Sequence, residues 1–465
     1  MTITDAAAAD AERTLSRRVR GWMMFDWASQ PFYTLCLTFV FGPYLSGVLA
    51  DAYLAQGLDP EAADAGAQAL WSRTQTFIGV GIALCAPVMG ALADRTARRL
   101  PWIWAFSVVY VVGLCGLWLM VPDASRTGIA LVSFALAMVG AEMTTLYTNA
   151  MLPSLGPPAA VGRISGSGYA LGYAGGVASL EVMLLFFAEN EAGLTLLGHP
   201  PALGLDGAAR EGTRIVGPFS ALWYLVFMVP FALWVREPAA RAAGRLSLGG
   251  AVGDVGRLLR GLPGRRSLSA FLLGSMLYRD ALVALYAFGG VYARLVLDWS
   301  TVQIGLFGIL GAVTAAAASW IGGRLDARHG PKPVIVGAVA VLTAVLLAIC
   351  ATDRTMVLGV PVAPGSGAPD LFLYGAGALI GGAGGVVQAA SRTLMARHAD
   401  PARPTEAFGL YALSGKATAF LAPALIWIGT EATGSARLGY LPVAGLFILG
   451  LGLLAWVRPD GDRLT

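Results

Sequence analysis

The chain is 465 residues long, and 56% of its residues are hydrophobic while only 13% are charged. Soluble domains carry about 25% charged residues, so this chain has too few polar side chains to cover three soluble cores. The mean hydropathy of +0.67 therefore predicts an integral membrane protein. We ascribe the formal charge of +4 to basic residues near cytoplasmic span ends and expect no nucleic-acid partner.

A helix needs about 20 apolar residues to cross a bilayer, and the sequence contains twelve such stretches. They predict an all-α integral membrane fold with twelve transmembrane helices, at 22–50, 74–93, 101–121, 128–151, 165–188, 217–235, 268–297, 302–321, 333–351, 371–391, 405–430 and 438–457.

The basic residues predict how these helices are oriented. The two termini and the even-numbered connections hold 23 Lys and Arg residues, and the opposite side holds seven. Because basic residues accumulate on the cytoplasmic side, we expect both termini in the cytoplasm. No cleaved signal peptide is expected, and a bacterial-type inner (plasma) membrane is the predicted location.

Two short connections, at 90–99 and 323–332, read alike and place Asp94 and Asp326 half a chain apart. An acidic residue followed by basic ones can pair charges at a hinge, so the repeat predicts a cytoplasmic gate. The alternative is that both are ordinary positive-inside turns. The expected gate residues are Asp94, Arg95, Arg98, Asp326, Arg328, Arg163 and Arg392.

Further motifs occur in both halves of the chain: Phe25-Asp26-Trp27-Ala28, Asn149-Ala150-Met151-Leu152-Pro153, Gly162-Arg163-Ile164-Ser165-Gly166, Tyr278-Arg279-Asp280, Gln388-Ala389-Ala390-Ser391-Arg392, Phe408-Gly409-Leu410-Tyr411 and Ser414-Gly415-Lys416. The paired connections resemble the major facilitator superfamily. The seven motifs resemble its branch of autophagy-related vacuolar amino-acid effluxers and their bacterial relatives.

The resemblance implies two six-helix bundles around a midplane cavity that works by alternating access. The implied division is a cytoplasmic N-terminal segment, an N-terminal bundle, a cytoplasmic central loop, a C-terminal bundle and a cytoplasmic tail, at 1–21, 22–235, 236–266, 267–457 and 458–465. It also implies amino-acid efflux.

Six ionisable residues fall inside the predicted spans: Asp26, Glu142, Glu181, Arg279, Asp280 and Lys416. Each costs about 2.5–3.5 kcal/mol when left unpaired near the bilayer centre, so each should face a cavity or a partner. We expect proton coupling at Asp26, Glu142 or Asp280. The alternative is that all six form static ion pairs that hold the helices together.

The substrate-binding candidates are Arg279, Lys416, Gln388, Asn149, Tyr147, Tyr278 and Trp27. Arg279 and Lys416 beside carboxylates would suit a zwitterion or an anion. We expect Arg279 to face Asp26 or Glu142, and Lys416 to face Asp280. For the uncharged polar candidates, helix–helix hydrogen bonding is an equal alternative.

Glycines recur at helical spacing, which allows close backbone approach in lipid. The rows are Gly168, Gly172 and Gly176; Gly305, Gly308 and Gly311; and Gly377, Gly381 and Gly385. They predict either a surface on which helices slide or static packing.

Enzyme chemistry is not expected, because the three histidines lie in predicted connections and no GxSxG motif occurs. The four cysteines lie singly in apolar runs, so no disulfide, metal site or cofactor is predicted. The predicted function is secondary transport of a small solute by a monomer, with protons and membrane lipid as partners. A lipid scramblase or a non-transporting sensor is the alternative.

Overall fold

The computed structural model describes residues 3–190, 192–237, 246–297, 299, 301–418, 421–435 and 437–462. The chain divides into two compact units. Unit 1 comprises 1–85, 96–148 and 171–244, and unit 2 comprises 86–95, 149–170 and 245–465. Residues 86–95 form the end of the helix Pro60–Thr96, and residues 149–170 include the start of the helix Pro158–Phe186. Both segments belong to unit 2 together with the second half of the chain.

The first half of the chain is helical apart from its loops. Its helices are α1 (Ile3–Pro31), the π-helix η1 (Phe32–Phe39), α2 (Phe41–Ala55), α3 (Pro60–Thr96), α4 (Leu100–Gly116), η2 (Leu117–Leu119), α5 (Thr127–Asn149), η3 (Leu152–Ser154), α6 (Pro158–Phe186), η4 (Ala202–Gly204), α7 (Glu211–Arg214), α8 (Val216–Phe227) and α9 (Val229–Trp234).

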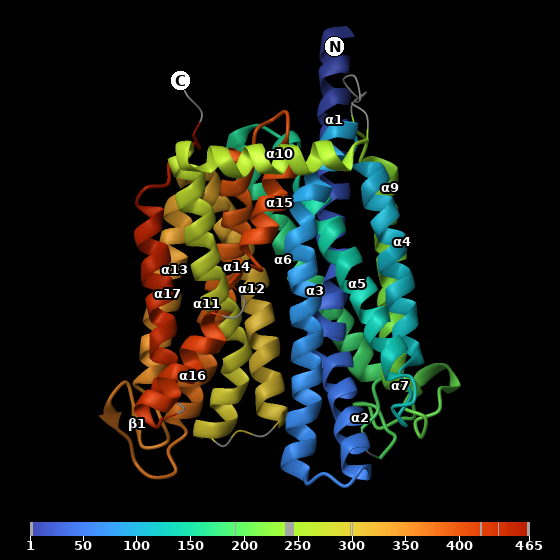
Figure 1. The fold of residues 1–465 in the computed structure, drawn as a ribbon, viewed down its shortest axis with the longest axis vertical. Coiled ribbons are helices and arrows are strands. Elements are labelled where there is room, and N and C mark those ends of the chain that lie inside the picture. The colour runs from blue at the N-terminus through green and yellow to red at the C-terminus, as the bar shows by residue number, and fades with distance from the viewer. Residues whose placement is uncertain are drawn as a thin grey trace. The chain divides into compact units, whose positions relative to one another are not determined.

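The second half adds a two-stranded antiparallel hairpin to its helices. Its elements are α10 (Leu248–Gly261), η5 (Leu262–Gly264), α11 (Arg266–Leu297), α12 (Thr301–His329), α13 (Pro331–Cys350), β1 (Met356–Val357), β2 (Val360–Pro361), α14 (Ala368–His398), α15 (Pro404–Ser414), α16 (Leu421–Thr433), η6 (Leu438–Tyr440) and α17 (Leu441–Leu454). The long helices of unit 2 run side by side, and α10 lies across their ends (Figure 1).

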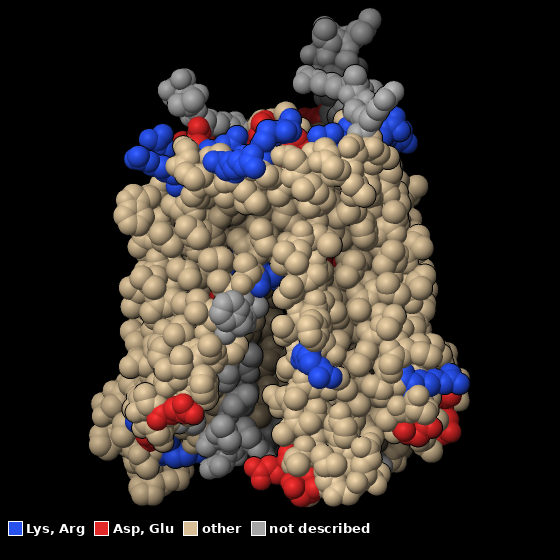
Figure 2. Space-filling model, in the orientation of Figure 1, with Lys and Arg blue, Asp and Glu red and all other residues tan. Residues whose placement is uncertain are grey.

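Ten helical segments of the described chain are long and apolar enough to cross a membrane. Each overlaps one of the first ten predicted spans, and several extend beyond the predicted bounds, as Pro60–Thr96 does relative to 74–93. The eleventh predicted span, 405–430, is interrupted between α15 and α16, and the twelfth corresponds to a shorter apolar helix, Leu438–Leu454. Twelve spans and cytoplasmic termini therefore stay predictions. On the face shown in Figure 2, most of the visible Lys, Arg, Asp and Glu side chains lie at the levels where the long helices of Figure 1 end, as expected for helices that cross a bilayer.

Each unit has its own packed interior. In unit 1, Phe134 of α5 packs against the rings of Phe32, Phe41 and Trp71. In unit 2, α12 and α14 pack closely because Gly381 has no Cβ. A Cβ at this position would lie only 2.1 Å from the carbonyl oxygen of Gly311. Both glycines belong to the rows predicted to permit close approach.

Candidate functional site

A break in the predicted eleventh span forms the first part of the candidate site. Helix α15 ends at Ser414, residues Gly415–Thr418 form turns, and α16 begins at Leu421. The amides of Gly415 and Lys416 still bond to carbonyls of the last turn of α15. Hydropathy alone predicted one continuous helix, since the turn is short and apolar residues lie on both sides of it.

Arg279 of α11 covers the carboxyl end of α15. Its Nη1 donates to the carbonyl oxygen of Tyr411 at 3.1 Å, and its guanidinium carbon lies 4.4 Å from the centre of the Tyr411 ring. Gly415 packs against it, and a Cβ there would lie 2.5 Å from Arg279 Nη2, so a larger residue would displace the guanidinium. A cation at a helix C-terminus and over an aromatic ring is favourable on both counts.

Asp280, the next residue, covers the amino end of α16. Its carboxylate is 6% exposed and accepts a hydrogen bond from the backbone N–H of Ala422 at 3.0 Å. A carboxylate at a helix N-terminus is favourable and satisfies an amide that has no partner within the helix. The observed hydrogen-bond partner of Asp280 is this amide, and not the ammonium of Lys416 as we had expected.

Arg279 and Asp280 thus act on two different helix ends. Consecutive helical residues point about 100° apart, which lets one side chain reach α15 while the other reaches α16. We call this pair the Arg279–Asp280 clasp. Lys416 is half-buried in the turn that the clasp flanks.

Other substrate-binding candidates lie on neighbouring helices of unit 2. Tyr278 is fully buried, and its hydroxyl lies 2.7 Å from Ser391 Oγ of α14. Gln388, also on α14, is half-buried. Asn149 is buried at the end of α5, and its Oδ1 accepts from Arg392 Nη1 at 3.2 Å.

Arg392 is almost completely buried and joins α14 to the start of α6. Its Nε donates to Ser165 Oγ at 2.9 Å, and its Nη2 donates to the Ser165 carbonyl at 2.7 Å. The guanidinium carbon also lies 4.2 Å from the centre of the Tyr169 ring. Asn149 and Arg392, predicted for a binding site and a gate respectively, therefore share one hydrogen-bonded cluster.

The first predicted gate aspartate caps a helix from the other half of the sequence. Asp94, near the end of α3, accepts hydrogen bonds from the backbone N–H groups of Thr405 and Glu406 at 3.2 and 2.7 Å. These amides begin α15, which starts at Pro404. The approach is close, because a Cβ on Gly90 would lie 2.5 Å from the Thr405 carbonyl oxygen.

Arg95, the neighbour of Asp94, binds a residue that sequence reasoning missed. Its Nε lies 2.6 Å from Asp254 Oδ2 of α10. Asp254 is buried and also contacts Arg257, while Arg403 Nη1 lies 3.8 Å away. Asp254 carried no signal in the sequence, because it lies in a predicted loop with no motif.

The second predicted gate aspartate faces the start of α6. Asp326 of α12 is 1% exposed, and a Cβ on Gly162 would lie 2.5 Å from its carboxyl carbon. Nearby, α6 and α12 cross at Gly166 and Gly323, where either Cβ would clash with the other glycine. The remaining arginines of the predicted gate, Arg98, Arg163 and Arg328, have exposed side chains.

In unit 1, three polar residues of α1 and η1 follow a glycine row of α6. A Cβ on Gly172 would lie 3.4 Å from Asp26 Cβ and 3.5 Å from Gln30 Oε1. One on Gly176 would lie 2.5 Å from Thr34 Oγ1. Asp26, Gln30 and Thr34 recur every four residues, so they share a face of the helix.

Trp27 points into an aromatic cluster of unit 1. Its ring stacks on Trp223 at 5.8 Å and meets Phe227 edge-on at 5.7 Å. Among the described residues its indole N–H has no hydrogen-bond partner. Tyr147 is buried beside the rings of Trp102 and Phe106.

Two predicted intramembrane acids of unit 1 differ in exposure. Glu142 of α5 is half-buried, and Glu181 of α6 is exposed. Glu142 stays a coupling candidate, and the position of Glu181 in the membrane stays a prediction.

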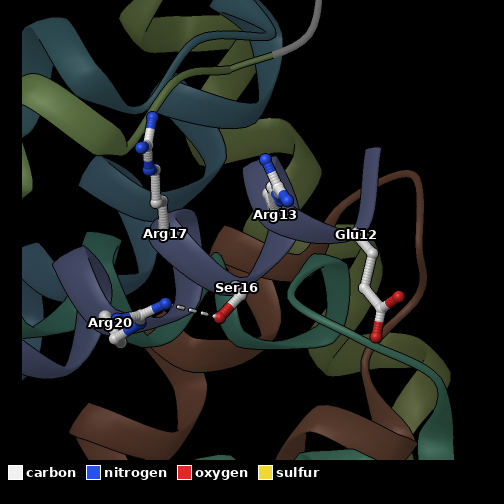
Figure 3. A pocket seen from close by; sticks show the side chains of 5 residues that line it. All are labelled: Glu12, Arg13, Ser16, Arg17 and Arg20. Carbon is white, nitrogen blue, oxygen red and sulfur yellow. Dashed lines mark hydrogen bonds between the residues drawn. The ribbon is translucent and has the colours of Figure 1, made fainter. Parts of the chain in front are cut away.

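Surface hollows do not mark the candidate site. One of about 520 Å³ is lined by Glu12, Arg13, Ser16, Arg17 and Arg20, all on α1, and Arg20 donates to Ser16 there (Figure 3). Another of about 340 Å³ in unit 2 is lined by residues that include Asp254, Arg257, Arg265, His398, Arg403 and Glu406. It lies between α10, α14 and α15, beside the contacts of Asp94 and Arg95.

Comparison with known proteins identifies the family. Residues 78–463 match the family model described as Vacuole effluxer Atg22 like. The chain belongs to this family. The Atg22-like chain is 21% identical to the Uncharacterized MFS-type transporter YxiO of Bacillus subtilis (strain 168), over 96% of both proteins.

A fungal relative is matched only in part. Autophagy-related protein 22-2 of Neosartorya fischeri is 23% identical over 65% of this chain. That match spans 50% of the fungal protein, so the Atg22-like chain covers about half the length of such relatives.

Solved structures show the same fold. The proton:xylose symporter XylE matches 96% of this chain and 97% of its own, with a TM-score of 0.67 and 13% identity. FucP in the outward conformation matches 95% and 98%, with a TM-score of 0.62 and 12% identity. The Atg22-like chain therefore has the all-helical fold of major facilitator transporters and is a multi-pass membrane protein.

Proposed function

We propose that the Atg22-like chain is a secondary active transporter that moves an amino acid or a similar small polar metabolite by alternating access. Transport is the function shared by its MFS-type relatives. The proposed direction is efflux, driven by protons, across a bacterial-type inner membrane. The observation that carries the proposal is the helix break flanked by the Arg279–Asp280 clasp.

The break supports binding of a solute that carries both charges. Discontinuous membrane helices expose a negative C-terminal end and a positive N-terminal end, which bind charged groups of substrates and ions. Here Arg279 lies at the first end and Asp280 at the second. Lys416 in the intervening turn adds a cation that suits a substrate carboxylate, and the neighbouring Tyr278 and Gln388 can supply hydrogen bonds.

Asp280 is the preferred residue for proton coupling. Protonation of its carboxylate would remove the negative charge that stabilises the start of α16. The helix end would then be free to bind the carboxylate of a substrate in place of Asp280. Protonation of Asp280 would therefore favour binding of a substrate carboxylate at the Ala422 amide, which couples the proton to the substrate. Asp26 and Glu142 remain candidates for additional protonation sites.

The contacts of Asp94 and Asp326 support a gate at the ends of the helices. Asp94 of α3 contacts the start of α15, and Asp326 of α12 faces the start of α6. Each contact joins the two halves of the sequence. Breaking and remaking these contacts would open and close one end of the substrate path. Arg392, held by Ser165 and Asn149, is proposed to strengthen the same closed arrangement.

Reconstituted protein tests the proposal. A thermal-shift screen against amino acids, dipeptides, sugars and drugs would find ligands, and flux of each hit into proteoliposomes would be measured with and without a pH gradient. Wild-type protein should accelerate flux when a gradient is imposed. Lipid flipping without flux of any solute would instead favour a scramblase.

Variants at Asp280 separate coupling from structure. Asp280→Asn keeps an oxygen that can accept from the Ala422 amide but cannot titrate, so gradient-driven flux should fall at least tenfold while substrate exchange persists. Asp280→Ala should lose both, because the start of α16 is uncapped. Asp123→Asn, in an exposed loop, is the matched control. Normal gradient-driven flux in Asp280→Asn, Asp26→Asn and Glu142→Gln alike would refute the coupling proposal.

A further inference from the structure

Helix α10 has an apolar face that the rest of unit 2 leaves uncovered. Leu248, Val252 and Leu259 are 65%, 56% and 44% exposed, and Val255 is half-buried between them. Their spacing of four, three and four residues places all four side chains on one stripe of the helix. We call these four residues the α10 stripe.

A second side of α10 attaches the helix to the rest of unit 2 through small and polar residues. Ala251 and Asp254 are buried, and Asp254 is held by Arg95 at 2.6 Å. Gly250 allows this contact, since a Cβ there would lie 2.4 Å from Arg95 Nη1. The helix is therefore attached along one side while the α10 stripe, about 120° away around the axis, is free.

Arginines cluster on and directly after α10. Arg257, Arg260, Arg265 and Arg266 are exposed, and no acidic residue occurs from 255 to 266. Arg260 and Arg266 have no ion pair within the described part of the chain. On the helix, Arg257 and Arg260 lie on a third face, so apolar and cationic faces are both exposed.

The position of α10 places it where spans leave the membrane. Arg95, its anchor, lies one residue before the end of the span Pro60–Thr96. The span Arg266–Tyr286 begins five residues after α10 ends, beyond the turn at Leu262–Gly264. Figure 1 shows α10 running across α11 and α14 instead of along them. A helix of 14 residues that runs across the spans at this level has the orientation expected of a helix on a membrane surface.

We propose that α10 is a membrane-surface helix that inserts the α10 stripe into the lipid leaflet and binds the phosphates of anionic phospholipids through Arg257, Arg260, Arg265 and Arg266. Amphipathic helices with an apolar stripe and flanking arginines bind anionic leaflets in this way. The exposed apolar stripe beside the arginines, at the level where two spans begin and end, favours a lipid leaflet over an acidic protein surface. The inference does not depend on which solute is transported.

Photo-crosslinking tests the insertion. The full-length protein would carry p-benzoyl-L-phenylalanine at position 252 or 253, in nanodiscs of phosphatidylcholine and phosphatidylglycerol. Val252 lies on the stripe, and Gly253 is exposed on another face. Lipid adducts should be at least fivefold more abundant at 252. Equal adducts at both positions, or crosslinks from 252 to a second protein copy, would overturn the proposal.

Native mass spectrometry tests the headgroup contacts independently. R260Q/R266Q should retain several-fold less phosphatidylglycerol than the wild type, while R260K/R266K should retain it. R324Q/R328Q removes the same charge from exposed positions at the end of α12 and serves as the matched control. An equal loss in both Gln variants would show that binding follows net charge and not α10, and would contradict the proposal.

Discussion

Arg392 of unit 2 is a buried arginine with several hydrogen bonds. Arg392 is 2% exposed, and its guanidinium bonds to Ser165 and Asn149 while it covers the Tyr169 ring. A planar fork with several donors fits this arrangement, whereas an ammonium cannot reach all of the acceptors at once. Removing the fork leaves buried acceptors without donors.

We expect Arg392→Gln to destabilise the protein by about 2–4 kcal/mol because several hydrogen bonds of a charged donor are lost. The melting temperature in detergent, measured by differential scanning fluorimetry, should fall accordingly. Arg392→Lys should recover only part of the loss. Arg328→Gln, at an exposed position, should leave the melting temperature unchanged. Normal stability of Arg392→Gln would show that these contacts contribute little.

The scarcity of charge in the spans predicted Arg279 and Asp280 as residues of interest, but not the backbone groups that they contact. Arg279 donates to the carbonyl of Tyr411, and Asp280 accepts from the amide of Ala422. The pairing of Arg279 with Asp26 or Glu142 stays a prediction. Backbone groups become available only where a helix is interrupted. In the apolar stretch 405–430, Gly415 and Pro423 were the signals for an interruption, but hydropathy alone gave weight to neither. Sequence reasoning therefore suggested side-chain partners.

At the scale of elements, two helices of unit 2 have their first amides capped by a carboxylate from another helix. Asp94 of α3 caps α15, and Asp280 of α11 caps α16. The first amides of a helix lack partners within it, and remote carboxylates satisfy them here. Each cap therefore ties two elements together and also stabilises the local helix end.

We expect Asp94→Ala to weaken the start of α15 by about 1 kcal/mol, the usual cost of losing an N-terminal cap. That corresponds to about fivefold faster hydrogen exchange at the amides of Thr405 and Glu406, measured by mass spectrometry of the peptide 404–414. Asp94→Asn should preserve slower exchange, since its side-chain oxygen still accepts.

Arg98→Ala is the control for this variant, because Arg98 follows Asp94 closely and its side chain is exposed. Its exchange should match the wild type. Unchanged exchange in Asp94→Ala would mean that the two hydrogen bonds do not hold the helix end in solution.

Glycine rows were predicted to pack helices closely, and the structure shows two degrees of closeness. Gly381 meets the carbonyl of Gly311 at a distance that excludes any Cβ, whereas Gly172 leaves room for one at 3.4 Å. The first row therefore serves tight packing of α14 on α12. In the second row, Gly172 leaves space beside Asp26, whereas Gly176 lies tightly against Gln30 and Thr34.

At the scale of the whole molecule, the sequence predicted the fold class because hydropathy over twenty residues is a strong signal. Ten predicted spans overlap long apolar helical segments, although some of these, such as Pro60–Thr96, extend well beyond the predicted bounds. The compact units, in contrast, do not follow the sequence halves, because residues 86–95 and 149–170 pack with the second half through Asp94, Arg392 and Gly166. Such contacts join residues more than 150 positions apart and leave no local pattern.

The topology is the remaining prediction at this scale, and the helix break makes it worth testing. If α15 and α16 together cross the membrane once, twelve spans and two cytoplasmic termini follow from the 23 to seven distribution of basic residues. A green fluorescent protein fused after Thr465 should then fluoresce, and alkaline phosphatase fused there should be inactive. Alkaline phosphatase inserted after Gly365 or Gly434 should be active, because both connections are then external. Activity after Thr465 together with inactivity after Gly434 would mean that the chain turns back at the break and crosses the membrane a different number of times.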